Sequence, residues 1–217
     1  MSDVQAGYFP VADEYAARLL DELDHKPLDG ELLDRFAERV RGMGAACDLG
    51  CGPGRIARYL HSRGVQARGV DLSLAMVERA RALNSGIEFV QCHMRSLAIE
   101  DGKFGGIAAF YSIIHIPRRE VVEVLHEMKR VLRPGGVLLL AFHVGDEIVH
   151  LDEWWGRRIS VDFAFFRPEE MGRYLAEAGL AVAEIVEREP YPDVEHPSRR
   201  AYIFAEKPRG PIESQPD

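Results

Sequence analysis

Apolar and polar residues alternate along this 217-residue chain with two different periods. Short, nearly continuous apolar runs, typical of strands buried on both faces, lie at 45–49, 66–71, 87–91, 106–111, 137–142, 180–186 and 202–205. Segments with helical spacing of apolar residues lie between most of them, at 55–63, 73–83, 118–131 and 168–178. Strands that alternate with helices in this way predict a doubly wound α/β protein. Its sheet is mostly parallel and carries helices on both faces.

Two stretches of the chain fall outside this alternation. Residues 1–43 contain helical patterns at 11–23 and 28–41, and we expect these two helices to cap the cleft at the edge of the sheet. Residues 143–166 are rich in aromatic and charged side chains. We expect an insertion there, with no more than one short strand.

A glycine-dense turn follows the first strand, in the run Asp48-Leu49-Gly50-Cys51-Gly52-Pro53-Gly54. Glycine reaches positive φ without a clash and lets a ligand approach the backbone closely. The helix that follows the turn presents free N–H groups at its N-terminus. The next strand ends on Asp71, whose carboxylate can accept hydrogen bonds from ribose hydroxyls. Together these features predict a βαβ unit that binds a nucleoside.

The glycine spacing distinguishes two nucleoside-binding classes. Gly50, Gly52 and Gly54 form G-x-G-x-G, whereas the dinucleotide fingerprint G-x-G-x-x-G needs a glycine at Arg55. With Asp48 ahead of it, the run resembles motif I of the class I S-adenosylmethionine (SAM)-dependent methyltransferases. Two later runs resemble motifs of that family in the family's order, Ser73-Leu74-Ala75-Met76 and Leu132-Arg133-Pro134-Gly135-Gly136. The resemblance implies a seven-stranded Rossmann-like sheet whose last strand is antiparallel and inserted between the fifth and the sixth.

The same resemblance implies which residues hold SAM. They are Tyr15, Asp48, Gly50, Cys51, Gly52, Asp71, Leu72, Met76, His93, Met94 and Ser112. The turn backbone faces the methionine moiety, Asp71 binds ribose, and Leu72 and Met76 sandwich adenine. The third strand departs from the family, because Cys92-His93 replaces the common Gly-Asp. A backbone contact at His93 and Met94 is expected there, although an ordinary surface position for His93 fits equally well.

Two histidines lie at the predicted catalytic edge. His115 follows the fourth strand and His143 ends the fifth, and either is a candidate general base that removes a proton from the acceptor. A structural role competes for both: His115 then ties its loop to the first helix, and a lone histidine at a strand end is usually structural. An acceptor that is already nucleophilic, such as a carboxylate or a thiolate, needs no base. Positioning in line then supplies much of the rate.

The insertion supplies the predicted acceptor site. Trp154, Trp155 and Phe163 are expected to form an apolar wall over the acceptor. Simple packing of the insertion onto the sheet explains the same aromatic residues. Both interpretations can hold together, because acceptor pockets are mostly apolar with a few placed polar groups.

Charged residues in the second half of the chain allow two further interpretations. Arg157, Arg158, Arg199 and Arg200 are expected to be exposed, and one or two of them can clamp a carboxylate or a phosphate bidentately. The acidic residues that follow His143 resemble a metal cluster but lack a recognisable ligand set. We therefore predict a solvated acidic loop and no metal.

Composition and charge limit the kinds of binding partner and the cellular location that we expect. The net charge is −8 and the basic clusters are short, so nucleic acid is not an expected partner. The three cysteines lack metal or disulfide spacing, which fits a reducing, cytoplasmic location. No apolar run approaches the ~20 residues of a membrane span, and the N-terminus lacks a signal-peptide pattern. We expect one domain over 1–210, a disordered tail at 211–217, and a monomer or a homodimer.

These observations predict methyl transfer from SAM to a small molecule, by in-line displacement, to oxygen or less readily to nitrogen or sulfur. A SAM-binding protein without turnover stays open as an alternative. A nucleotide-linked oxidoreductase also stays open, although the missing fingerprint glycine counts against it. An RNA methyltransferase stays open as well, although the sequence lacks the basic surface expected for it. The sequence does not specify the acceptor, because this fold hosts many substrates.

Overall fold

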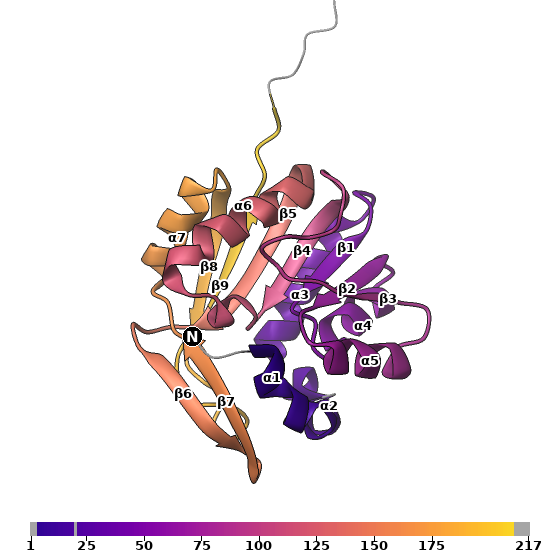
Figure 1. The fold of residues 1–217 in the computed structure, drawn as a ribbon. Coiled ribbons are helices and arrows are strands. Elements are labelled where there is room, and N and C mark those ends of the chain that lie inside the picture. Colours follow the sequence, from indigo (N-terminus) through magenta and orange to yellow (C-terminus); the bar gives the residue numbers. More distant parts are fainter. Residues whose placement is uncertain (1–3, 20, 211–217) are drawn as a thin grey trace, which may run out of the picture.

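The fold is seen in a computed structural model that describes residues 4–19 and 21–210. Seven strands form one sheet (Figure 1), in the order β3 (Glu88–Gln91), β2 (Ala67–Asp71), β1 (Ala46–Leu49), β4 (Phe104–Phe110), β5 (Leu132–His143), β9 (Arg200–Glu206) and β8 (Ala181–Arg188). Neighbours from β3 to β5 pair in parallel, whereas β9 is antiparallel to both β5 and β8. The predicted α/β sheet, with its last strand inserted antiparallel between the fifth and the sixth, is confirmed.

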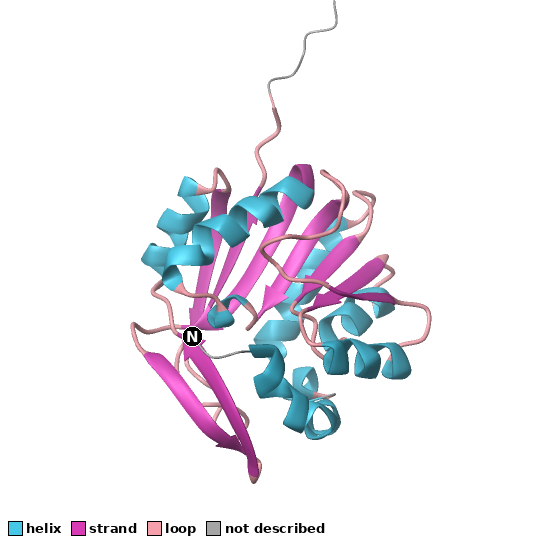
Figure 2. Ribbon diagram, viewed as in Figure 1, coloured by secondary structure: helices cyan, strands magenta, loops and turns pink. Residues whose placement is uncertain are grey.

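Helices cover both faces of the sheet (Figure 2). One face packs against α6 (Val121–Val131) and α7 (Pro168–Glu177), and the other against α3 (Pro27–Val40), α4 (Arg55–Ser62) and α5 (Leu74–Leu83). The side chains of β4 alternate between the two cores, as the period of two in a strand requires. Every residue of β4 is therefore buried, which explains its continuous apolar run.

The turn from β1 to α4 depends on its glycines. Gly50, Gly52 and Gly54 all have positive φ, between 52° and 85°. At Gly50 an added Cβ would collide with the side chain of Ser112. At Gly54 an added Cβ would lie 2.7 Å from the ring of Phe89. The glycine pattern is therefore a packing requirement of the turn as well as an opening for a ligand.

The N-terminal region is divided into more and shorter helices than its apolar pattern predicts. In place of one helix over 11–23, the structure has η1 (Phe9–Val11), α2 (Ala12–Leu19) and η2 (Glu22–His25), preceded by α1 (Val4–Tyr8). The second predicted helix is present as α3. Ser73 is the N-cap of α5, and its hydroxyl accepts the N–H of Met76 over 3.5 Å. The short helices η3 (Ile113–His115) and η4 (Arg118–Glu120) connect β4 to α6.

The insertion is a β-hairpin, so the expectation of no more than one short strand is wrong. β6 (Ile148–Trp154) pairs antiparallel with β7 (Arg157–Ala164) across a two-residue turn, Trp155-Gly156, in which both residues have positive φ. β7 keeps the alternation through Ile159, Val161 and Phe163, whereas a register shift between Leu151 and Glu153 breaks it in β6. The hairpin extends beyond the sheet and lies against α1 (Figure 1), where Val11, Ile159 and Val161 form a small core.

No helix within 4–19 or 21–210 is both long and apolar enough to cross a membrane. The predicted disordered tail at 211–217 lies outside the described residues.

Candidate active site

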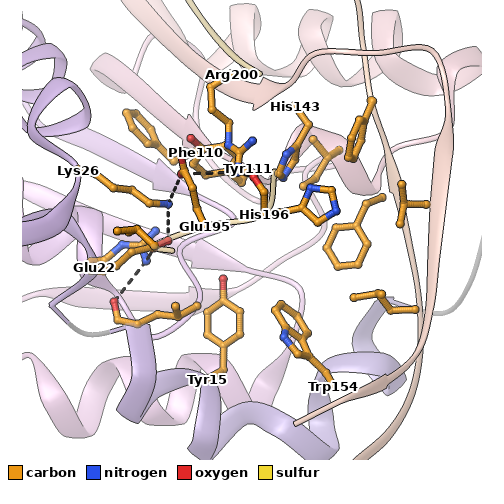
Figure 3. A pocket seen from close by; sticks show the side chains of 18 of the residues that line it. Tyr15, Glu22, Lys26, Phe110, Tyr111, His143, Trp154, Glu195, His196 and Arg200 are labelled. Carbon is orange, nitrogen blue, oxygen red and sulfur yellow. Dashed lines mark hydrogen bonds and ion pairs between the residues drawn. The ribbon is translucent and has the colours of Figure 1, made fainter. Parts of the chain in front are cut away.

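Two cavities open beside the carboxyl ends of the parallel strands, where ligands bind in such sheets. The smaller, which we name the turn cavity, has a volume of about 120 Å³ and lies over the glycine turn. The larger, the hairpin cavity, has about 520 Å³ and lies among the hairpin, the N-terminal helices and residues 193–196 (Figure 3). Both cavities are lined by Tyr8, Tyr15, Phe110 and Tyr111, so the two spaces adjoin across these side chains.

The turn cavity collects most of the residues predicted for the cofactor. From that set its lining contains Tyr15, Gly50, Gly52, Asp71, Leu72, Met76, His93, Met94 and Ser112. Ser112 is buried, and its hydroxyl donates to the carbonyl of Leu49 over 2.7 Å, which joins the end of β4 to the end of β1. Val4 and Tyr8 of α1 also line this cavity, so the N-terminal segment lies over it.

Asp71 is held in one orientation by the backbone. One carboxylate oxygen accepts the N–H of Gly52 and the other accepts the N–H of Ser73, each over 2.8 Å. Burial raises the pKa of Asp71, and these backbone donors oppose the rise. Each oxygen keeps lone pairs for a ligand hydroxyl, so Asp71 can accept further hydrogen bonds from inside the cavity.

Asp48 and Cys51 shape the turn from behind and do not line either cavity. A carboxylate oxygen of Asp48 accepts the N–H of Ala57 over 2.9 Å, which satisfies a free donor in the first turn of α4. Burial raises the pKa of Asp48 to about 7. The Cys51 sulfur packs so closely on Gly69 that an added Cβ there would lie 2.9 Å from it. The side chains of both residues therefore help to build the turn, and their contact with the cofactor stays a prediction.

His115 has both ring nitrogens engaged. Its Nδ1 lies 3.2 Å from the carbonyl oxygen of Asp162, which can only accept, so Nδ1 carries the proton. Its Nε2 then accepts the hydroxyl of Tyr8 over 3.1 Å. Burial lowers the pKa of His115 to about 4. This histidine joins η3, the hairpin and α1, which favours the structural interpretation over the role of general base.

His143 lines the hairpin cavity at the end of β5. Its ring stacks on Phe165 with centroids 4.7 Å apart, and its Nδ1 lies 2.8 Å from the hydroxyl of Ser198. Burial, followed by the positive charge of Arg200, lowers the pKa of His143 to about 3. The imidazole is therefore neutral near pH 7 and has a fixed orientation.

The hairpin provides an apolar wall, as the aromatic residues predict. Trp154 and Phe163 line the hairpin cavity. Trp155 does not line it but stacks behind Trp154, with ring centroids 4.7 Å apart. Arg157 is exposed and lies outside the lining of either cavity, so the structure does not bring this predicted substrate residue to the site.

Charged residues form the opposite wall, and Figure 3 shows Glu22, Lys26, Glu195 and Arg200 there. Arg55 also lines this wall. Of these five, the sequence indicated only Arg200, as one of four arginines that can clamp an anion. The expectation that Arg200 is exposed is wrong, because only 2 % of it is accessible. Arg200 pairs opposite His143 in the antiparallel β5–β9 register and donates to the hydroxyl of Ser198 over 2.5 Å. No local pattern identifies these residues, since they come together only through strand register and loop packing.

Tyr111 stands in a strained conformation where the two cavities meet. Its φ of 53° is in the left-handed region, which is uncommon for a residue other than glycine. Its hydroxyl lies 3.3 Å from that of Tyr202, and its ring lies 5.4 Å from the ammonium of Lys26. Strain of this kind persists where the surroundings hold it and is concentrated at functional sites.

The acidic loop after β5 is occupied by ion pairs. Asp146 pairs with Arg167, and His150 lies 2.6 Å from Asp162 and 3.0 Å from Asp152. Within the described ranges, no group of three or more histidine, cysteine, aspartate or glutamate side chains is arranged to hold a metal ion. The absence of a metal stays a prediction.

Comparisons with known proteins agree with this architecture. Residues 46–136 match a family model described as a methyltransferase domain. The chain is 27% identical over 133 residues to a malonyl-[acyl-carrier protein] O-methyltransferase of Enterobacter lignolyticus, covering 60% of this chain and 52% of that protein. It is 29% identical over 209 residues to a ubiquinone biosynthesis O-methyltransferase of Azotobacter vinelandii, covering 86% and 88%. A SAM-dependent methyltransferase structure from Methanosarcina mazei superposes with a TM-score of 0.68 at 19% identity, over 76% of this chain and 93% of that one.

These findings connect residues 46–136 with methyltransferase domains, and the fold of the chain with that of SAM-dependent methyltransferases. The Methanosarcina mazei structure is that of a SAM-dependent enzyme, so SAM is the cofactor to compare with the turn cavity. The chain spans about half the length of the first two relatives, 52% and 55%.

The residues of the turn cavity fit this cofactor. Asp71 offers a carboxylate for ribose hydroxyls, and Leu72 and Met76 offer apolar surface for a base. At Gly52 an added Cβ would lie 3.8 Å from the ring of Tyr15, so the absence of a side chain leaves room beside that ring. The polar and apolar groups of this cavity therefore match the chemistry of SAM, which is a nucleoside joined to an amino acid.

Proposed function

We propose that this chain transfers a methyl group from SAM to an oxygen atom of a small molecule. The observation that carries the proposal is the wall shared by the two cavities. Tyr8, Tyr15, Phe110 and Tyr111 lie between a nucleoside-type site and a chamber with one apolar and one charged wall, so a cofactor and an acceptor can meet there. Both relatives named above are O-methyltransferases, which supports oxygen as the acceptor atom.

The residues of the chain contribute mainly by positioning. SAM supplies an activated methyl group on its sulfonium. Asp71, Leu72 and Met76 orient the nucleoside, and the backbone at Gly50 and Gly52 lets the amino-acid end approach closely. The hairpin and α1 enclose the acceptor chamber and exclude water. Holding the reacting atoms in line in this way can supply much of the rate.

His143 is the histidine proposed to contact the acceptor. It lines the hairpin cavity, and its orientation is held by Phe165 and Ser198. As a neutral imidazole it accepts a hydrogen bond from an acceptor hydroxyl. His115 is proposed to act only through Tyr8, as the residue that positions α1 over the turn cavity.

The size of the chamber supports a small acceptor. A volume of about 520 Å³ lies within the range of small-molecule sites. The unpaired thiols of Cys47, Cys51 and Cys92 support the proposal of a reducing, cytoplasmic location.

Calorimetric titration with S-adenosylhomocysteine (SAH) tests the cofactor site directly. We expect binding by the wild type and a loss of about tenfold to a hundredfold in Asp71→Ala, because a hydrogen-bonding charged group is removed. Asp101→Ala is the matched control, since Asp101 is 79% exposed and pairs with Arg130 at a distance from both cavities.

Two outcomes contradict the proposal. If the protein binds NADH and does not bind SAH, the glycine turn is a dinucleotide-binding turn and the proposal is wrong. SAH binding without SAM consumption across a panel of small acceptors identifies a SAM-binding protein without turnover.

A further inference from the structure

The charged wall of the hairpin cavity is buried. The side chains of Lys26, Glu195 and Arg200 are 4%, 3% and 2% exposed. Lys26 pairs with Glu195 over 3.0 Å and also with Glu22. Charges this deep in a protein are costly unless they are compensated, so the balance of the wall matters.

The side chains joined by these buried ion pairs carry one more positive charge than negative charges. The ion pairs connect four cations, Lys26, Arg55, Arg188 and Arg200, with three anions, Glu22, Asp29 and Glu195. None of the seven side chains is more than 15% exposed. Asp48, which is also buried, acts on Arg55, the cation that pairs with Glu22. The other acidic residue of the lining, Asp193, is exposed. The unmatched positive charge therefore lies around Lys26, Arg188 and Arg200, which share Asp29 and Glu195.

The lowered pKa of His143 is consistent with a positive electrostatic potential inside the hairpin cavity. After burial, the charge of Arg200 is the largest cause that lowers its pKa, and Lys26 acts in the same direction. Glu195 opposes this without cancelling it. A field that disfavours a cation at His143 favours an anion beside it.

The facing wall is apolar. Val149, Leu151, Trp154, Phe163 and Phe165 line the hairpin side of the cavity. A molecule that satisfies both walls has an apolar or aromatic body and one anionic end.

We propose that the acceptor of the hairpin cavity is a small carboxylic acid with an aromatic or aliphatic body, bound as its carboxylate. The carboxylate lies toward Lys26 and Arg200, and the body packs on Trp154 and Phe163. This inference rests on the proposed function, because it names the substrate class of the acceptor site. An uncharged molecule of the same shape leaves the extra positive charge uncompensated and binds more weakly.

Matched acids and amides test the charge preference by calorimetry. The probes are cinnamate with cinnamamide and octanoate with octanamide, each titrated into the protein with and without saturating SAH. We expect at least one acid to bind about tenfold more tightly than its amide, as a charge-assisted contact requires. Raising the salt concentration lowers the affinity of the acid and leaves that of the amide unchanged.

Variants of Lys26 locate the preference. Lys26→Met brings the buried balance to zero, and the acid-to-amide ratio falls toward one. Lys26→Arg keeps the charge and retains the ratio. Arg157→Met is the control, because Arg157 is exposed on the hairpin and lies outside the lining. If Lys26→Met does not fold, the salt dependence of the wild type still tests whether the preference for the acid arises from charge, and Lys26→Arg tests whether it survives with the charge kept.

The outcomes separate the two proposals. If SAH binds and no acid exceeds its amide, the carboxylate inference is overturned and the proposed function stands. If an acid is preferred but SAH does not bind, the anion site stands without the methyltransferase assignment. Loss of the acid preference in Arg157→Met also overturns the inference, since the charged wall is then not its source.

Discussion

At the scale of single residues, hydrogen-bond partners decide what each histidine can do. His115 follows β4 and His143 ends β5, at the same edge of the sheet. The sequence therefore offers both as candidates for the general base. The backbone carbonyl of Asp162 and the hydroxyl of Tyr8 occupy both nitrogens of His115. His143 has a side-chain partner only at Nδ1 among the contacts described above, and it lines the hairpin cavity. The difference arises from the hairpin and α1, which pack onto His115.

Replacing His143 tests its proposed contact with the acceptor. We expect His143→Gln to lower kcat by about fivefold to tenfold, because a fixed hydrogen-bond partner of the acceptor is lost. SAH affinity is expected to stay unchanged, because His143 lies outside the turn cavity. The wild-type rate is expected to show no acidic limb between pH 8 and about pH 5, since the pKa of His143 is lowered to about 3. Wild-type turnover by His143→Gln contradicts the assignment.

At the scale of elements, α1 and the hairpin depend on each other. A Cβ added at Gly7 would collide with Val161 of β7, so the helix and the strand are in close contact. Tyr8 donates to His115 from the same helix. An isolated two-stranded hairpin is marginal in water, and this packing gives it a third partner. The pair covers both cavities, so its stability is expected to affect ligand exchange.

Tyr8→Phe removes one hydrogen bond from this cover. We expect a cost of about 1 kcal/mol, or about a fivefold rise in local opening, because the partner at His115 is left unpaired. Hydrogen exchange over residues 4–19 measures the opening, and SAH dissociation is expected to accelerate in parallel. Tyr174→Phe removes a comparable hydrogen bond, to Glu170 in α7, and serves as the control. Equal exchange at 4–19 in both variants argues against this role for Tyr8.

At the scale of the whole molecule, buried histidines link stability to pH. Burial lowers the pKa of His115 from 6.5 to about 4, so the unfolded chain binds its proton more readily than the folded one. The contribution of His115 is therefore complete above about pH 6.5 and is lost as pH falls toward 4. Asp48, whose pKa is raised to about 7, has the opposite dependence and offsets part of the loss.

The variant His115→Gln isolates this contribution. Denaturant unfolding of wild type and variant at pH 7 and pH 4 is expected to show about 3 kcal/mol less acid destabilisation in the variant. Taking the difference at each pH removes the offset from Asp48. Parallel stability curves for the two proteins contradict the assignment of a lowered pKa to His115.

The sequence by itself determined the features that arise from neighbouring residues. Apolar runs located the strands because burial on both faces demands them, and glycine spacing with Asp71 identified the cofactor turn because its geometry is local. One strand of the hairpin was missed because a register shift between Leu151 and Glu153 breaks the alternation in β6. Only the tertiary structure assembled the proposed acceptor site. Lys26, His143 and Arg200 meet through the β5–β9 register and the packing of the N-terminal helices, and no residue's neighbours along the chain encode such long-range pairing.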